Sequence, residues 1–220
     1  MSTDSTPSEA AVPPSADTAE NAPATTGGRK RPKPGERRVQ ILQTLASMLE
    51  QPGAERITTA ALAARLDVSE AALYRHFASK AQMFEGLIEF IEQSVFTLVN
   101  QIAERETSGT VQAQKVLTVL LQFCEKNPGM TRVMVGDALV FENDRLKQRM
   151  NQFFDKIEST LKQSLRVASD ASGSATPSVD AQIQASVLTA FVMGRLQRFA
   201  RSGFKRLPSE HLEASLALML

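Results

Sequence analysis

The stretch Thr58–Lys80, TTAALAARLDVSEAALYRHFASK, decides the fold. Apolar side chains recur at helical spacing in its first part and predict a short helix over about residues 59–66. Asp67 follows, and Asp tolerates the left-handed backbone that a tight turn between helices needs. Ser69 can then cap a second helix, over about residues 70–77, by accepting a backbone hydrogen bond. Two short helices joined by a turn of this length make a helix-turn-helix.

The second helix of a helix-turn-helix enters the major groove of DNA with its N-terminal side chains at the base edges. The predicted base-facing residues are therefore Ser69, Glu70, Ala71 and Ala72. Most of them are small, so thymine methyl groups, water and DNA shape would supply part of the readout. The other candidate DNA contacts of this stretch, mainly phosphate contacts, are Thr58, Thr59, Tyr74, Arg75, His76 and Lys80. The alternative is two ordinary bundle helices joined by a capped turn.

Charge is distributed unevenly along the chain. The 220 residues carry 25 Lys and Arg against 24 Asp and Glu, yet residues 1–28 contain acidic residues and no basic one. A basic block over residues 29–38 follows, and it adds the candidate DNA contacts Arg29, Lys30, Arg31 and Lys33. A basic block beside a folded domain suggests an anionic partner such as DNA. The alternative is a solvated linker that keeps the protein in solution.

Composition divides the chain into three parts. Residues 1–35 are rich in Ser, Thr, Ala, Pro and Gly and lack large apolar side chains. Such a segment cannot bury enough apolar surface to offset the entropy lost on ordering, so we predict a disordered acidic and proline-rich tail that ends in the basic arm. A helix-turn-helix DNA-binding domain over residues 36–82 and a helical domain over residues 83–220 follow.

Apolar residues recur every three to four positions through the rest of the chain, and no segment shows sustained alternation with a period of two. We therefore predict an all-α fold with about nine helices. Ser79 and Gln82 have the spacing of a capping box and should open a long helix, and Ser209 can cap the last one. The predicted helices lie at about 39–49, 59–66, 70–77, 80–102, 111–124, 130–140, 146–165, 183–196 and 210–220, with a loop over 168–178.

Several protein classes are excluded or unsupported. A single cysteine, Cys124, rules out an intramolecular disulfide and fits a reducing compartment, and no apolar run is long enough to span a membrane. Cys124 lies on an apolar helical face and reads as a buried core thiol, and His211 reads as a surface residue. No phosphate-binding loop, dinucleotide fingerprint or zinc-binding histidine pair is present. The sequence therefore supports neither an enzyme nor a cofactor or metal site.

The residues Val68-Ser69, Leu73–Phe77 (LYRHF) and Ser79-Lys80 resemble the helix-turn-helix of the TetR family of bacterial regulators. The resemblance implies an all-α fold of nine or ten helices, with an N-terminal DNA-binding head and a C-terminal bundle. It also implies a homodimer that binds DNA and dimerises through its eighth and ninth helices. Asp67 departs from the family pattern, which usually has Gly there.

Longer stretches, Arg56–Ser94, Asn127–Glu158 and Arg195–Lys205, are similar to the nucleoid-occlusion branch of that family, and the similarity covers about residues 36–220. It implies a cytoplasmic, nucleoid-associated division inhibitor that binds palindromic chromosomal DNA. In its DNA-bound form such a protein binds the C-terminal tail of the tubulin-like GTPase FtsZ and antagonises Z-ring assembly. How many dimers bind each DNA site stays open.

An off-core aromatic residue suggests where a partner could bind. At about 100° per residue, Phe90 points about 110° away from the apolar stripe of its long helix, so it can be an exposed contact for a partner. The alternative is a helix packed on both sides, and Phe96 is off the stripe in the same way. The family resemblance implies an FtsZ-tail site along this helix and the one ending at Lys126-Asn127. The candidate residues are Phe90, Lys126 and Asn127.

Two rival functions remain. One is a conventional TetR-type repressor that is released from DNA by a small molecule bound inside the bundle. Residues 81–220 contain no Trp or Tyr, which disfavours an aromatic-lined ligand pocket. The other is a helical interaction protein without a DNA function, and the basic block and the 69–80 segment argue against it.

Overall fold

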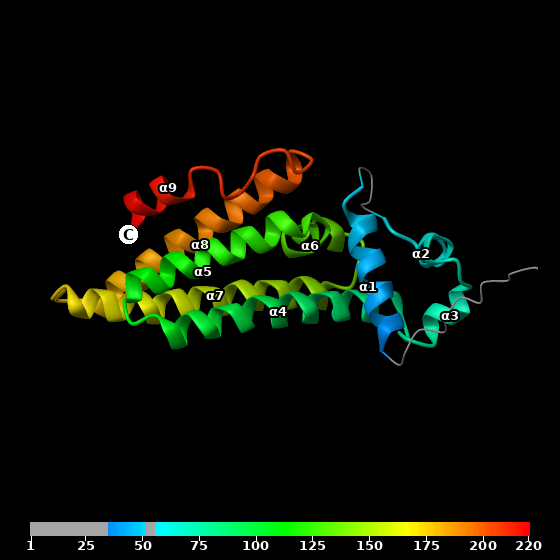
Figure 1. The fold of residues 1–220 in the computed structure, drawn as a ribbon, viewed down its shortest axis with the longest axis horizontal. Helices are drawn as coiled ribbons and strands as arrows, with labels where there is room; N and C mark the ends of the chain where they lie inside the picture. The colour runs from blue at the N-terminus through cyan, green and yellow to red at the C-terminus, as the bar shows by residue number, and fades with distance from the viewer. Residues whose placement is uncertain (1–34, 52–55) are drawn as a thin grey trace, which may run out of the picture. The chain divides into compact units, whose positions relative to one another are not determined.

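The computed structural model describes residues 35–51 and 56–220, which belong to one unit spanning Pro32–Leu220. The described part contains nine α-helices, one 3-10 helix and no strand (Figure 1), so the predicted all-α fold is confirmed. Arg29, Lys30, Arg31 and Lys33 lie outside the described residues, as does the rest of the predicted tail up to residue 34. The helices are α1 Glu36–Leu49, α2 Thr59–Leu66, α3 Glu70–Tyr74, α4 Lys80–Arg105, α5 Gly109–Lys126, α6 Pro128–Met134, η1 Asp137–Leu139, α7 Asp144–Ala171, α8 Pro177–Arg201 and α9 Leu212–Met219.

Local hydrogen bonds build the helix-turn-helix from α2 and α3. The Thr58 hydroxyl accepts the backbone N–H of Ala61 at 3.1 Å and caps α2, and the Ser69 hydroxyl accepts that of Ala72 at 3.3 Å and caps α3. Asp67 ends α2 with φ 55° and ψ 50°, the left-handed conformation expected for the turn. The second helix is shorter than predicted and ends at Tyr74, because the chain turns again to reach the start of α4.

The long helix α4 connects this head to the bundle. The Ser79 hydroxyl accepts the backbone N–H of Gln82 at 3.2 Å, as the predicted capping box requires. The Gln82 side chain accepts the backbone N–H of Ala78 at 2.8 Å rather than that of Ser79, one residue earlier than in a standard capping box. Phe84, Ile88, Ile91 and Val95 of the apolar stripe of α4 are buried, whereas Ile102 near the end of the helix is only partly buried. The stripe packs against the bundle formed with α5, α7 and α8.

Three further predictions about helix ends are wrong. The helix predicted over 130–140 is broken into α6 and η1, because Gly136 adopts a left-handed φ of 85°. The loop predicted over 168–178 is shorter, since α7 runs to Ala171 and Pro177 begins α8. Ser209 does not cap α9. His211 occupies that position with φ 53° and no side-chain cap, while the Ser209 N–H donates to Glu125 of α5 at 2.8 Å.

Close backbone contact ties α1 to α6. A Cβ added at Gly129 would lie 1.9 Å from the carbonyl oxygen of Ala46, so the two helices approach more closely than any side chain would permit. Arg132 adds longer contacts of 3.4 Å to the carbonyl oxygens of Leu49 and Gln51, at the end of α1. The first helix of the head is thus held against the bundle helix that follows α5.

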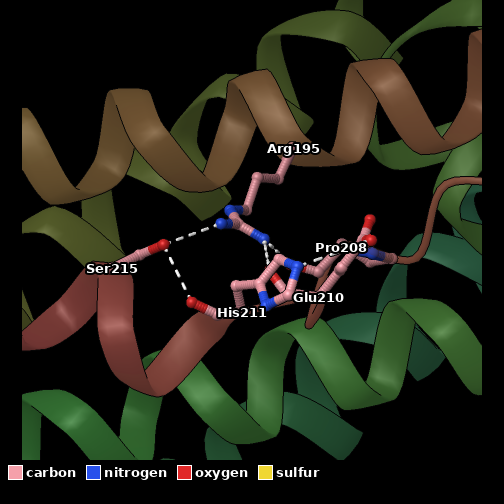
Figure 2. A network of polar contacts seen from close by, with 5 residues as sticks. All are labelled: Arg195, Pro208, Glu210, His211 and Ser215. Atoms are coloured by element: carbon pink, nitrogen blue, oxygen red, sulfur yellow. Dashed lines mark hydrogen bonds and ion pairs between the residues drawn. The ribbon is translucent and has the colours of Figure 1, made fainter.

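Arg195 holds the segment between α8 and α9 (Figure 2). Its guanidinium donates to the carbonyl oxygens of Pro208 at 2.9 Å and Glu210 at 2.5 Å, and to the Ser215 hydroxyl at 2.9 Å. Burial, and to a smaller extent the neighbouring charge of Arg198, lower the pKa of Arg195 from its ordinary value. The side chain therefore acts as a structural clamp on the start of α9.

The outer face of α8 carries apolar side chains that this chain does not cover. Ile183 and Val187 are exposed, together with Val179 one turn earlier. Leu188 and Leu196 lie on another face of α8 and are buried in the core.

Candidate nucleic-acid interface

Predicted DNA contacts from α2 and α3 meet in a small polar network. The Tyr74 hydroxyl donates to Thr59 Oγ1 at 3.4 Å, and the Thr59 hydroxyl donates to Glu70 Oε2 at 2.5 Å. Tyr74 and Glu70 are exposed and Thr59 is partly buried. The network orders three polar side chains on one surface of the head and fixes the start of α2 against α3.

The N-terminal part of α3 is open to solvent. Ser69, Glu70 and Ala71 are exposed and Ala72 is partly buried, whereas Leu73 is buried and packs α3 onto the head. Because the side chains of Ser69, Ala71 and Ala72 are short, a binding partner can come close to the backbone at the start of α3. The predicted base-facing positions therefore share an accessible surface, with Glu70 as their only charged side chain.

The segment after α3 combines accessible and structural groups. Arg75 is exposed, and His76 is partly buried. Arg38 of α1 donates to the carbonyl oxygen of His76 and stacks 4.2 Å from the centre of the Phe77 ring. Arg38 therefore holds α1 against this turn, a role that its place in the basic block did not indicate.

Lys80, predicted to contact phosphate, is already paired. Its Nζ lies 2.5 Å from Glu142 Oε1, in the segment between η1 and α7, and 5.7 Å from the centre of the Phe84 ring. Sequence reasoning missed Glu142, because 62 residues separate the two and no local pattern joins them.

The candidate partner residues lie on α4 and at the end of α5, two helices that pack against each other. The Phe90 side chain is 47% exposed, as its helical position predicted, whereas Phe96 packs edge-on against Phe153 with ring centres 5.4 Å apart. Lys126 is exposed. Asn127 is partly buried and donates from its amide to the Phe123 carbonyl oxygen at 2.7 Å.

The described residues give no sign of a reactive thiol, a metal site or a membrane span. Cys124 is fully buried, and burial raises the pKa of its thiol to about 12, so it is a neutral core side chain as predicted. Within residues 35–51 and 56–220, no three His, Cys, Asp or Glu side chains are grouped to hold a metal ion. None of the helices in the same residues is long and apolar enough to cross a membrane.

Comparison with known proteins covers both halves of the chain. Residues 41–87 match the family described as bacterial regulatory proteins of the tetR family, and residues 107–220 match the SlmA-like, tetracyclin repressor-like C-terminal domain. "Nucleoid occlusion factor SlmA" of Aliivibrio fischeri is 52% identical over 86% of this chain and 96% of that protein. The protein of the same name from Idiomarina loihiensis is 50% identical over 83% of this chain and 93% of its own length.

The chain belongs to the SlmA family of nucleoid occlusion factors. The names of these relatives are those of regulatory factors rather than enzymes.

Solved structures agree on the fold of this SlmA-family chain. AibR, in complex with isovaleryl coenzyme A and operator DNA, aligns with a TM-score of 0.67 at 14% identity, over 83% of this chain and 97% of AibR. FadR from Bacillus subtilis, in complex with stearoyl-CoA, aligns with a TM-score of 0.66 at 13% identity, over 82% of this chain and 96% of FadR. At such identities the likeness shows the TetR fold alone.

Proposed function

We propose that this SlmA-family chain binds palindromic chromosomal DNA as a homodimer and, in the DNA-bound state, binds the C-terminal tail of FtsZ and antagonises Z-ring assembly over the nucleoid. The observation that carries the proposal is the sequence identity to nucleoid occlusion factors. About half of the aligned residues are identical, and the alignment spans more than four fifths of the chain. It includes the bundle as well as the head. We place the protein in the cytoplasm, at the nucleoid.

The exposed start of α3 supports the DNA-binding part. Ser69, Glu70 and Ala71 can face base edges, and Tyr74 and Arg75 can reach phosphates from the same surface. Thr58 and Thr59 begin α2, where backbone N–H groups favour an anion. Ala72, His76, Lys80 and the basic arm with Arg29, Lys30, Arg31 and Lys33 complete the proposed DNA contacts.

The uncovered apolar face of α8 supports the homodimer. Val179, Ile183 and Val187 lie one helical turn apart, so they form a continuous row on one face of the helix. Such a row exposed to water is stabilised when a second copy covers it. A two-fold dimer presents its two heads symmetrically, which matches the two half-sites of a palindrome.

The exposed Phe90 supports the FtsZ-binding part. A half-exposed phenylalanine can insert into a partner and contribute much of a small interface, and the exposed ammonium of Lys126 can meet a carboxylate of a peptide. Asn127 contributes a polar rim beside them. Because α4 also begins at the head, DNA and the tail would be bound by the same helix.

Fluorescence anisotropy of a labelled FtsZ-tail peptide tests this function. The peptide is titrated with the protein alone and with the protein pre-bound to a palindromic duplex. We expect a saturable rise with the DNA-bound protein, weakened at least tenfold by Phe90→Ala, as for loss of a central interface residue. Phe141→Ala is the matched control, because it removes another exposed phenylalanine from outside the proposed site.

An absent rise with folded, DNA-bound protein would favour the second candidate, a conventional repressor with a small-molecule inducer. A solvent-open pocket of about 370 Å³ between α6, α7 and α8 favours this candidate, with Met134, Met150 and the exposed Met193 among its lining residues. An inducer would release the protein from DNA, and bulky substitution at Met150 would abolish that release.

A further inference from the structure

Three ion pairs join α4 to the beginning of α7 and to the segment before it, and their polarity reverses at the head. Glu85 pairs with Arg145, and Glu92 pairs with Arg149, so in both cases the acid is on α4 and the base is on α7. At the end nearest the helix-turn-helix the arrangement is opposite. Lys80 supplies the base from α4, and Glu142 supplies the acid from the bundle side.

The position of Lys80 is unfavourable for a cation within a helix. It is the first residue of the 26-residue α4, directly after the Ser79 cap. The start of a helix carries partial positive charge, so a lysine there is stabilised only when an anion lies close by. The Glu142 carboxylate is that anion in the free protein, and a DNA phosphate is the same kind of partner.

Glu142 is held inward although its neighbours are not. The side chain of Glu142 is 11% exposed and that of Lys80 is 28% exposed, while the preceding Phe141 is 67% exposed. Water and salt screen such a half-buried pair less than a surface pair. Glu142 therefore holds Lys80 firmly enough to influence any other anion that uses the same ammonium group.

We propose that Glu142 competes with a DNA phosphate for Lys80. In the free protein Glu142 holds the ammonium group, and on DNA the ammonium moves to a phosphate and leaves Glu142 as an unpaired carboxylate. The inference rests on the proposed DNA-binding function. It assigns to Glu142, a residue of the bundle, the role of weakening DNA binding and of responding to DNA at the junction with the head.

The exchange has a signature in the salt dependence of binding. A lysine that neutralises one phosphate releases counterions and contributes about 0.9 to the slope of log affinity against log salt concentration. We expect the freed carboxylate of Glu142, which then lies beside the DNA, to hold back one of these cations, so that the two effects nearly cancel. The pair Lys80–Glu142 should therefore contribute almost nothing to the slope, in spite of a phosphate contact.

The test is a double-mutant cycle on the affinity of the full-length protein for a palindromic duplex over a series of salt concentrations. We expect Glu142→Gln to steepen the slope by about 0.9 and to raise the affinity roughly tenfold near 0.1 M salt, since Lys80 then gives its full counterion release. Lys80→Gln alone should leave the slope unchanged. The double variant should return to the wild-type slope.

Glu92→Gln is the matched control, because it also removes one acid from an ion pair along α4, but farther from the head. Glu92→Gln should leave both the salt slope and the affinity near wild type. If it steepens the slope as much as Glu142→Gln does, the steepening comes from the loss of one negative charge and the proposal is overturned. A slope lowered by about 0.9 in Lys80→Gln would mean an uncontested phosphate contact and would overturn the proposal. The salt slope of Lys80→Gln tests the proposal even if Glu142→Gln folds poorly. Thermal unfolding of each variant shows whether it is folded. A wild-type protein that binds no palindromic DNA would instead overturn the proposed function.

Discussion

Gly129 of α6 lies against the backbone carbonyl of Ala46 in α1, at a separation that leaves no room for a Cβ atom. This contact joins the first helix of the DNA-binding head to the helix that begins just after Lys126 and Asn127. Both groups in contact are backbone, so neither can yield by changing a side-chain rotamer.

Gly129→Ala should therefore push α6 away from α1. We expect the free energy of unfolding to fall by about 1–3 kcal/mol, the usual range for an overpacked core. Denaturant unfolding followed by circular dichroism measures it. An unchanged midpoint would mean that α1 and α6 separate without cost.

Ile183→Glu should convert the proposed dimer into a monomer. The substitution puts a charge in the middle of the exposed apolar row of α8, where a second copy would have to desolvate it. Sedimentation equilibrium measures the change in mass. Leu207→Glu, at an exposed leucine outside that row, is the control and should stay dimeric.

Arg195→Ala should loosen the start of α9. Two carbonyl oxygens and one hydroxyl lose their donor, and each such loss typically costs about 1 kcal/mol or more where water enters poorly. Hydrogen exchange of the backbone amides in Leu212–Met219 should become faster. Arg201→Ala, at an exposed arginine at the end of α8, should leave that exchange rate unchanged.

Cys124 should make stability depend on pH at the alkaline end. Burial raises the pKa of its thiol from 9.0 to about 12, so between these values the unfolded chain releases a proton that the folded chain keeps. The contribution is fully present below pH 9 and declines as the pH rises toward 12. Comparison with Cys124→Ala by denaturant unfolding at pH 8 and pH 10 isolates it, and a difference between the two proteins that does not change with pH would contradict the assignment.

The sequence was sufficient where the cause is local. The turn at Asp67 and the caps at Thr58 and Ser69 follow from a few neighbouring residues, and the structure agrees with each. The same local spacing puts both Phe90 and Phe96 off the apolar stripe of α4, yet only Phe90 is exposed. The break at Gly136 was missed because glycine is compatible with a helix as well as with a left-handed turn.

Features that depend on distant residues could not be predicted. Apolar periodicity predicted a helix over residues 183–196, but it could not tell which apolar side chains of α8 this chain covers and which, such as Ile183 and Val187, stay exposed. The pairing of Lys80 with Glu142 depends on how α4 and α7 are packed, and the residues next to each of them in the sequence do not predict it.

The continuity of α4 sets a distance between two molecules. Phe90 follows Lys80 by ten residues of uninterrupted helix, which correspond to about 15 Å along the axis. With DNA held at one of these residues and the FtsZ tail at the other, the two proposed sites would stay at that fixed separation along the helix axis. An insertion of a few residues between them would change that separation and also rotate the tail site around the helix, so spacing and orientation cannot be altered separately.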